Sequence, residues 1–171
     1  MSRGIGAHAN LVLEDENTVM YEYGGYNLNE PEYRNEKHLY DGMITIARDC
    51  FVEPEIHEKL KKMPSGRKKL ITKRIPVSVD YPQMISDGRI IIENCSNCWH
   101  RSPESNIDVM ALHILFYLFR QYQEEGKMPE YTKHMLIYTH TTNTCSYTDI
   151  HIKHMLIYRH TKHMLIYRHT H

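Results

Sequence analysis

The most apolar stretch of the chain runs Ile107-Asp-Val-Met-Ala-Leu-His-Ile-Leu-Phe-Tyr-Leu-Phe-Arg-Gln-Tyr122. Between Val109 and Phe119 only His113 is strongly polar, so the pattern predicts a helix that is covered on most of its circumference. The segment from Val109 to Phe119 has 11 residues, whereas a membrane span needs about 20. We therefore expect a buried core helix and no membrane partner.

The ends of this helix carry recognisable signals. Ser105 or Asn106 can cap the first turn, because a short polar side chain accepts a hydrogen bond from a free backbone N–H. Asp108 would lie in the first turn, where the helix dipole favours a negative charge. Gly126 can adopt the left-handed conformation that ends a helix, and Pro129 prevents its resumption.

Strand patterns precede the helix. Alternating apolar residues, β-branched runs and turn signals predict strands at 10–13, 18–23, 43–47, 68–75 and 89–93. Strands followed by one long helix indicate an α+β domain. We expect a mostly antiparallel sheet of about five strands, packed against one long C-terminal core helix and followed by a repetitive tail.

A short helix is also predicted over 54–62. Pro54 is tolerated at the first helical position. Glu53 and Glu55 lie near the start, and Lys61 and Lys62 lie at the end, an order that suits the helix dipole.

The charge distribution divides the chain into two parts. Residues 132–171 hold five of the 21 basic residues and one of the 21 acidic residues, which leaves 16 basic and 20 acidic residues in 1–131. We predict a globular domain over 1–131 and a separate tail over 132–171. Nothing before Asn10 resembles a signal peptide, so the expected location is cytoplasmic.

The tail repeats a nonapeptide. The sequence 133–141 returns with one change at 153–161, and the copies at 153–161 and 162–170 are identical. Nine residues are too few for a structural repeat unit, so we interpret the copies as a duplicated segment. Eight of the 13 histidines lie in the tail; it is predicted to be disordered or to form short strands, and weak metal binding by its histidines is the alternative.

Cys95-x2-Cys98-x-His100 is the densest motif of metal-ligand residue types. Two thiolates at this spacing can share one Zn²⁺, with His100 as a third ligand and Cys50 or His113 as the fourth. Because no second pair of this kind exists, three interpretations stay open. They are two ordinary thiols, a zinc site and a redox pair.

A basic run is the second candidate site. Half of the 16 basic residues in 1–131 fall within 59–74, where no acid occurs: Lys59, Lys61, Lys62, Arg67, Lys68, Lys69, Lys73 and Arg74. Phosphate backbones bind such surfaces. Alternatively, these lysines only solvate a helix end and protect an edge strand from aggregation.

The functional expectation follows from these two candidate sites. No nucleophile, phosphate-loop or zinc-protease motif is present, so we expect a non-enzymatic cytoplasmic protein that contacts nucleic acid through the basic run without a cofactor. The alternative is a protein-interaction module, an adaptor or inhibitor, with a surface split between this run and the acidic residues Glu14, Asp15, Glu16, Glu30, Glu32 and Glu36. A weaker alternative is a domain stabilised by zinc on Cys95 and Cys98.

Overall fold

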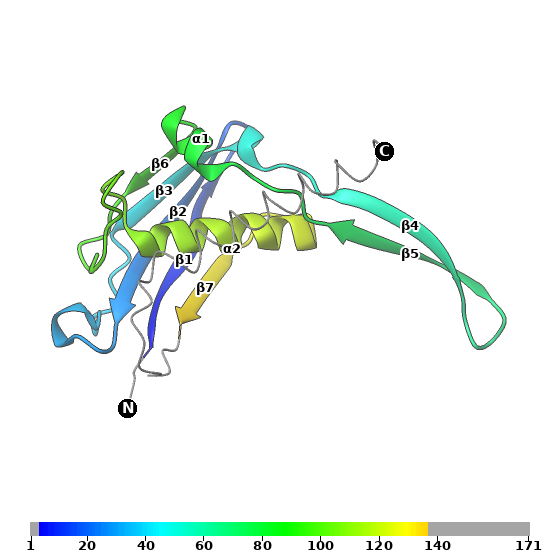
Figure 1. Ribbon diagram of the computed structural model, residues 1–171, viewed down its shortest axis with the longest axis horizontal. Helices are drawn as coiled ribbons and strands as arrows, with labels where there is room; N and C mark the ends of the chain where they lie inside the picture. Colours follow the sequence, from blue (N-terminus) through cyan, green and yellow to red (C-terminus); the bar gives the residue numbers. More distant parts are fainter. Residues whose placement is uncertain (1–3, 137–171) are drawn as a thin grey trace, which may run out of the picture. The chain divides into compact units, whose positions relative to one another are not determined.

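The structure is a computed structural model that describes residues 4–136 (Figure 1). The later copies of the nonapeptide and most tail histidines lie outside the described residues. Within the described range, no helix has the length and the apolar character that crossing a membrane requires.

The central element is a five-stranded antiparallel sheet. Its spatial order is β6-β3-β2-β1-β7. The strands are β1 (Ile5–Glu14), β2 (Thr18–Asn27), β3 (Gly42–Ala47), β6 (Ile90–Glu93) and β7 (Tyr131–Leu136). The predicted α+β class, with a mostly antiparallel sheet and one long helix, is confirmed. β7 pairs with β1 and contains the start of the first nonapeptide copy.

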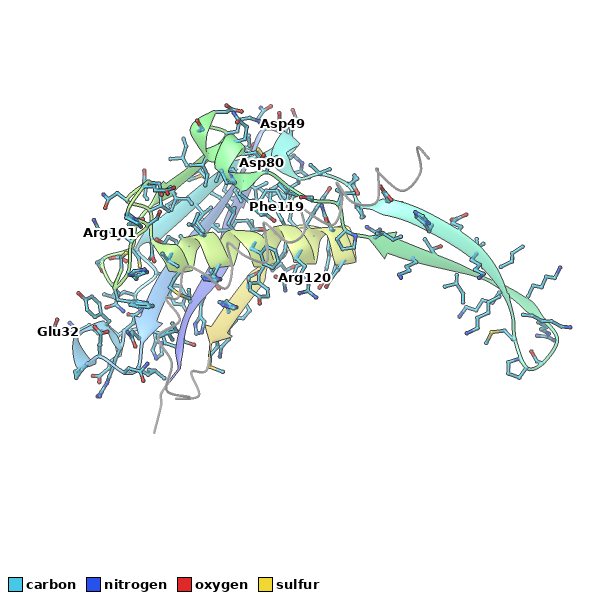
Figure 2. All side chains as sticks on the ribbon, viewed as in Figure 1. Glu32, Asp49, Asp80, Arg101, Phe119 and Arg120 are labelled. Atoms are coloured by element: carbon cyan, nitrogen blue, oxygen red, sulfur yellow. The ribbon has the colours of Figure 1, made fainter. Side chains whose placement is uncertain are left out.

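The core lies between this sheet and α2 (Val109–Glu125). Successive strand residues point to opposite faces, and Ala7, Ala9 and Tyr21 are fully buried on the face toward α2. From α2, Phe119 stacks on Phe51 with ring centroids 4.6 Å apart (Figure 2). Short helices complete this body: α1 (Tyr81–Ser86) and the 3-10 helices Pro31–Tyr33 and Arg48–Cys50.

The start of α2 differs from the sequence prediction. The N-cap is Asp108, whose carboxylate accepts from the Met110 N–H at 2.9 Å. Neither Ser105 nor Asn106 caps the helix, because Asn106 is in the left-handed region with φ 56° and its N–H donates to the Ser102 carbonyl. The end agrees with prediction, since Gly126 adopts φ 76°.

The helix predicted over 54–62 is wrong. This segment is β4 (Glu55–Lys62), which pairs antiparallel with β5 (Lys68–Ile75) in a separate two-stranded sheet. A strand needs a partner for its backbone N–H and C=O groups, and the turn at 63–67 places 55–62 directly beside β5. This mutual pairing outweighs local charge and proline preferences for a helix.

Two contacts anchor the base of this hairpin to α2. The side-chain amide of Gln123, which is 2% exposed, donates to the carbonyls of Val52 and Val77, each at 3.2 Å. These carbonyls belong to the segments that enter and leave the hairpin. The Arg74 guanidinium lies against Gly126, where an added Cβ would be 2.3 Å from Nη1.

Candidate nucleic-acid interface

The β4–β5 hairpin is exposed along its length. Every residue from 55 to 74 is exposed, and only Ile75 at its base is partly covered. Figure 1 shows the two strands as a curved ribbon, and Figure 2 shows side chains projecting from both of its sides. Such a ribbon has no core of its own, so its side chains are available for contact with another molecule.

The strand register divides the basic residues between the two faces of the ribbon. One face, which we call the lysine face, carries His57, Lys59, Lys61, Lys69 and Lys73, together with Glu55, Ile71 and Ile75. This face borders an open hollow of about 580 Å³ that is lined in part by Lys59, Lys61 and Lys73.

The other face, which we call the leucine face, carries the remaining strand cations together with apolar side chains. Lys62 lies opposite Lys68, and Leu60 lies opposite Leu70. Arg74 lies opposite Ile56 at the base, while Arg67 belongs to the turn between the strands. All eight predicted basic residues therefore lie on one hairpin, but on two faces and a turn.

Like charges face each other near the turn. Lys61 is directly opposite Lys69, and the next pair is Lys62 with Lys68. Directly opposed like charges destabilise an antiparallel pair. Over residues 4–136, none of the eight cations has a carboxylate within 4.0 Å, since the ion pairs there involve other residues. An external polyanion would relieve this repulsion.

The two thiols of the cysteine motif donate hydrogen bonds to different acceptors. The Cys95 thiol donates to the Asp108 carboxylate at 3.4 Å, and the Cys98 thiol donates to the His100 carbonyl at 3.6 Å. Burial raises the pKa of Cys98, and it raises the pKa of Cys95 to about 12. Zinc binds thiolates, so a zinc ion here would have to displace the protons of both thiols.

The other residues considered for zinc lie in separate contacts. The His100 ring stacks on Trp99, the His113 ring stacks on His134, and the Cys50 thiol points to the Arg89 carbonyl at 3.9 Å. In the part of the chain that the structure describes, no group of three or more His, Cys, Asp or Glu side chains is placed to hold a metal ion. Zinc binding stays a prediction.

A buried polar network surrounds the Asp108 carboxylate. It accepts from the Tyr23 hydroxyl at 3.1 Å, and that hydroxyl accepts from the Cys95 N–H at 3.1 Å. Asp108 and Tyr23 are both fully buried, and burial raises the pKa of both. The sequence identified Asp108 as a helix-start residue but contained no signal for its buried partners.

A cavity that sequence reasoning missed lies between β1, β2 and the segment 28–41. It has a volume of about 130 Å³ and is lined by His8, Tyr26, Arg34 and His38, among others. The only signal in the sequence was the polar composition of 26–37. His8 lies before the first strand that was predicted, so its place in β1 was not expected.

Comparison with known proteins supplies no relative. The chain matches no model of a protein family, no curated protein and no solved structure.

Proposed function

We propose that this chain is a non-enzymatic module that binds nucleic acid through the β4–β5 hairpin. The observation that carries the proposal is the set of cations near the turn, where two successive lysine pairs face each other without a carboxylate partner. Positive charge held in this way is neutralised most effectively by a ligand with closely spaced negative charges, such as a phosphate backbone.

The shape of the element supports the same ligand. A two-stranded β-ribbon fits the major groove of B-form DNA, and the strands of this ribbon are exposed on both faces up to its base. The attachment to α2 through Gln123 holds the base. The lysine face would then contact phosphates, which position a protein without reading the base sequence.

The test compares two adjacent lysine pairs on opposite faces. Lys61→Gln/Lys69→Gln removes two charges from the lysine face, and Lys62→Gln/Lys68→Gln removes two charges one residue further along, from the leucine face. Binding of the full chain to a labelled DNA duplex and to single-stranded RNA is measured by fluorescence anisotropy over a salt series. The tail and the number of charges are the same in both variants.

The expected result is a difference between the faces. If both lysines of the first pair contact phosphates, the slope of log K against log salt becomes flatter by about 1.8 in that variant. The leucine-face variant should change the slope by less than half of this. Wild-type protein that does not bind either nucleic acid at low salt would overturn the proposal, and so would equal binding by all three proteins.

A protein partner is the second candidate, favoured by the leucine face. Ile56, Leu60 and Leu70 are 58%, 62% and 51% exposed, and clustered exposed apolar side chains often mark interaction surfaces. The charge split between the basic hairpin and the acidic N-terminal residues could orient such a partner. Leu60→Ser/Leu70→Ser should abolish capture of a protein partner and leave nucleic-acid binding unchanged. Loss of nucleic-acid binding with no effect on protein capture would contradict this candidate.

A further inference from the structure

The cavity between β1, β2 and the segment 28–41 is rich in hydrogen-bond donors. Its lining includes His8, Tyr26, Arg34, Asn35, His38 and Tyr40, and no Asp or Glu side chain contributes to it. Ala7 and Ala9 face the core, so His8 between them lies on the face of the sheet away from α2. This site is therefore separate from both the core and the hairpin.

Two side chains that line this cavity each have a buried nitrogen atom without a hydrogen-bond partner in the described part of the chain. Arg34 Nε and His8 Nε2 are buried, and neither has a hydrogen-bond partner within residues 4–136. The other ring nitrogen of His8 lies 3.1 Å from the Tyr40 hydroxyl. Leaving a charged donor buried and unpaired is costly, and the arginine guanidinium stays protonated in proteins. Arg34 lines the cavity, so a ligand with acceptor oxygens bound there would lie beside this residue.

A tight turn forms one wall of the cavity. Asn35 and His38 adopt φ 54° and 51°, in the left-handed region where asparagine and histidine occur more often than most other non-glycine residues. The Asn35 side chain fixes this turn, because it accepts from the Leu39 N–H at 2.9 Å and donates to the Leu39 and Gly25 carbonyls. These hydrogen bonds hold the wall of the cavity in one conformation.

Glycine lets the wall approach the sheet. At Gly24, an added Cβ would lie 2.0 Å from the Leu39 carbonyl oxygen. Gly24 is directly opposite His8 in the β1–β2 register, so the same close approach places the 35–38 turn beside His8.

The electrostatic surroundings also favour an anion. Burial lowers the pKa of His8, and the nearby positive charges of Lys133 and His38 lower it further. Lys133 lies opposite His8 in the β1–β7 register. The neighbouring carboxylate of Glu22 accepts from the Asn10 side-chain amide at 2.9 Å. Positive side chains thus lie near His8, and Glu22, although close enough to raise the pKa of Tyr40, does not line the cavity.

We propose that this cavity binds a tetrahedral oxyanion, namely a phosphate group, through Arg34, His8 and His38. Its volume of about 130 Å³ is several times what one water molecule requires. Guanidinium and imidazole N–H groups are strong donors to phosphate oxygens, and the tyrosine hydroxyls of Tyr26 and Tyr40 can complete the shell. The phosphate can come from free phosphate, from a mononucleotide or from the end of a nucleic-acid strand.

Calorimetric titration of the full chain with inorganic phosphate tests the proposal. Wild-type protein should bind phosphate saturably, and Arg34→Gln should weaken the affinity at least about tenfold. Lys127→Gln removes an exposed cation that belongs to neither the cavity nor the hairpin and should leave the affinity unchanged. Because Arg34 is partly buried, His38→Gln at an exposed position provides a second variant, and it should also weaken binding.

Further titrations distinguish the sources of the phosphate. A nucleoside monophosphate and a 5′-phosphorylated oligonucleotide are compared with the same oligonucleotide ending in a 5′-hydroxyl, all in the Lys61→Gln/Lys69→Gln background. Preference for the phosphorylated end that is lost in Arg34→Gln would identify a strand end as the ligand. Absence of saturable binding to every phosphate compound would overturn the proposal, as would equal affinities in wild type, Arg34→Gln and His38→Gln. Neither result depends on whether the hairpin binds nucleic acid.

Discussion

Replacing Asp108 by alanine is the most informative test of how the helix is joined to the sheet. The carboxylate caps α2 through the Met110 N–H and also accepts from the Tyr23 hydroxyl. Asp108→Ala therefore removes an N-cap and leaves the hydroxyl of a fully buried tyrosine without its acceptor; the Cys95 thiol, a weak donor, also loses its acceptor, at little cost. The two losses occur at one position but have different physical causes.

The magnitude follows from these two losses and one offset. Loss of an N-cap costs about 1 kcal/mol, and an orphaned buried donor costs about 1–3 kcal/mol. The offset comes from removing a carboxyl group whose pKa is raised by burial, since its ionised form is unfavourable in the core. We expect Asp108→Ala to lower the free energy of unfolding by about 2–3 kcal/mol, or Tm by about 4–12 °C.

Urea denaturation of the single variants Asp108→Ala and Tyr23→Phe and of the double variant separates the causes. Tyr23→Phe removes the hydroxyl that Asp108→Ala leaves without an acceptor. The double variant should therefore be more stable, by at least about 1 kcal/mol, than the sum of the two single effects predicts. The Cys95 N–H loses its acceptor in both proteins that carry Tyr23→Phe, so this effect cancels in the cycle. A destabilisation below about 0.5 kcal/mol for Asp108→Ala, or an additive cycle, would refute the reasoning.

Four further outcomes follow from the packing and the shifted pKa values. Phe119 is a core residue that is 1% exposed, so Phe119→Ala should lower the free energy of unfolding by about 3–5 kcal/mol in urea titrations. A decrease below about 1 kcal/mol would contradict the burial of this side chain in the core. Gly24→Ala should cost about 1–3 kcal/mol, because its Cβ would meet the Leu39 carbonyl at 2.0 Å; a neutral substitution in thermal melts would show that the turn moves freely. Burial is the main cause that lowers the pKa of His8 in the folded protein below 6.5. The folded protein then binds fewer protons than the unfolded chain, so it loses stability as the pH falls from 6.5 through the folded pKa. In thermal melts over this pH range, the Tm of His8→Gln should depend less on pH than the Tm of the wild type. Burial leaves Cys95 2% exposed and raises its pKa to about 12, so Cys95 should react with iodoacetamide at pH 8 far more slowly than in urea; peptide mass mapping that finds equal rates would contradict this burial.

The parts of the fold that depend on local pattern were predictable. The apolar run 107–122 identified the core helix, because a helix with so little polar surface must be covered. Gly126 identified its end, because the left-handed conformation favours glycine. Alternation in 18–23 and the apolar run at 89–93 identified strands of the central sheet.

The hairpin shows where local preference was insufficient. Pro54 and the end charges favour a helix, and they do so independently of what lies beside the segment. The neighbouring strand β5 has backbone groups that need partners, and β4 supplies them across a turn of five residues, 63–67. A helix-propensity pattern contains no information on a cross-strand partner. The sequence prediction therefore assigned Lys61 to a helix and Lys69 to a strand, whereas the two residues lie opposite each other.

The candidate sites divide in the same way. By itself, the amino-acid sequence determined the long core helix, the antiparallel α+β class and the concentration of positive charge in 59–74, since these depend on residue types and short-range spacing. Only the tertiary structure decided that the cations share one exposed ribbon, that Cys95 donates to Asp108, and that His8 meets Arg34 and His38 at one cavity. The physical reason is that protonation, charge opposition and cavity lining depend on contacts between distant segments, which strand register and burial bring together.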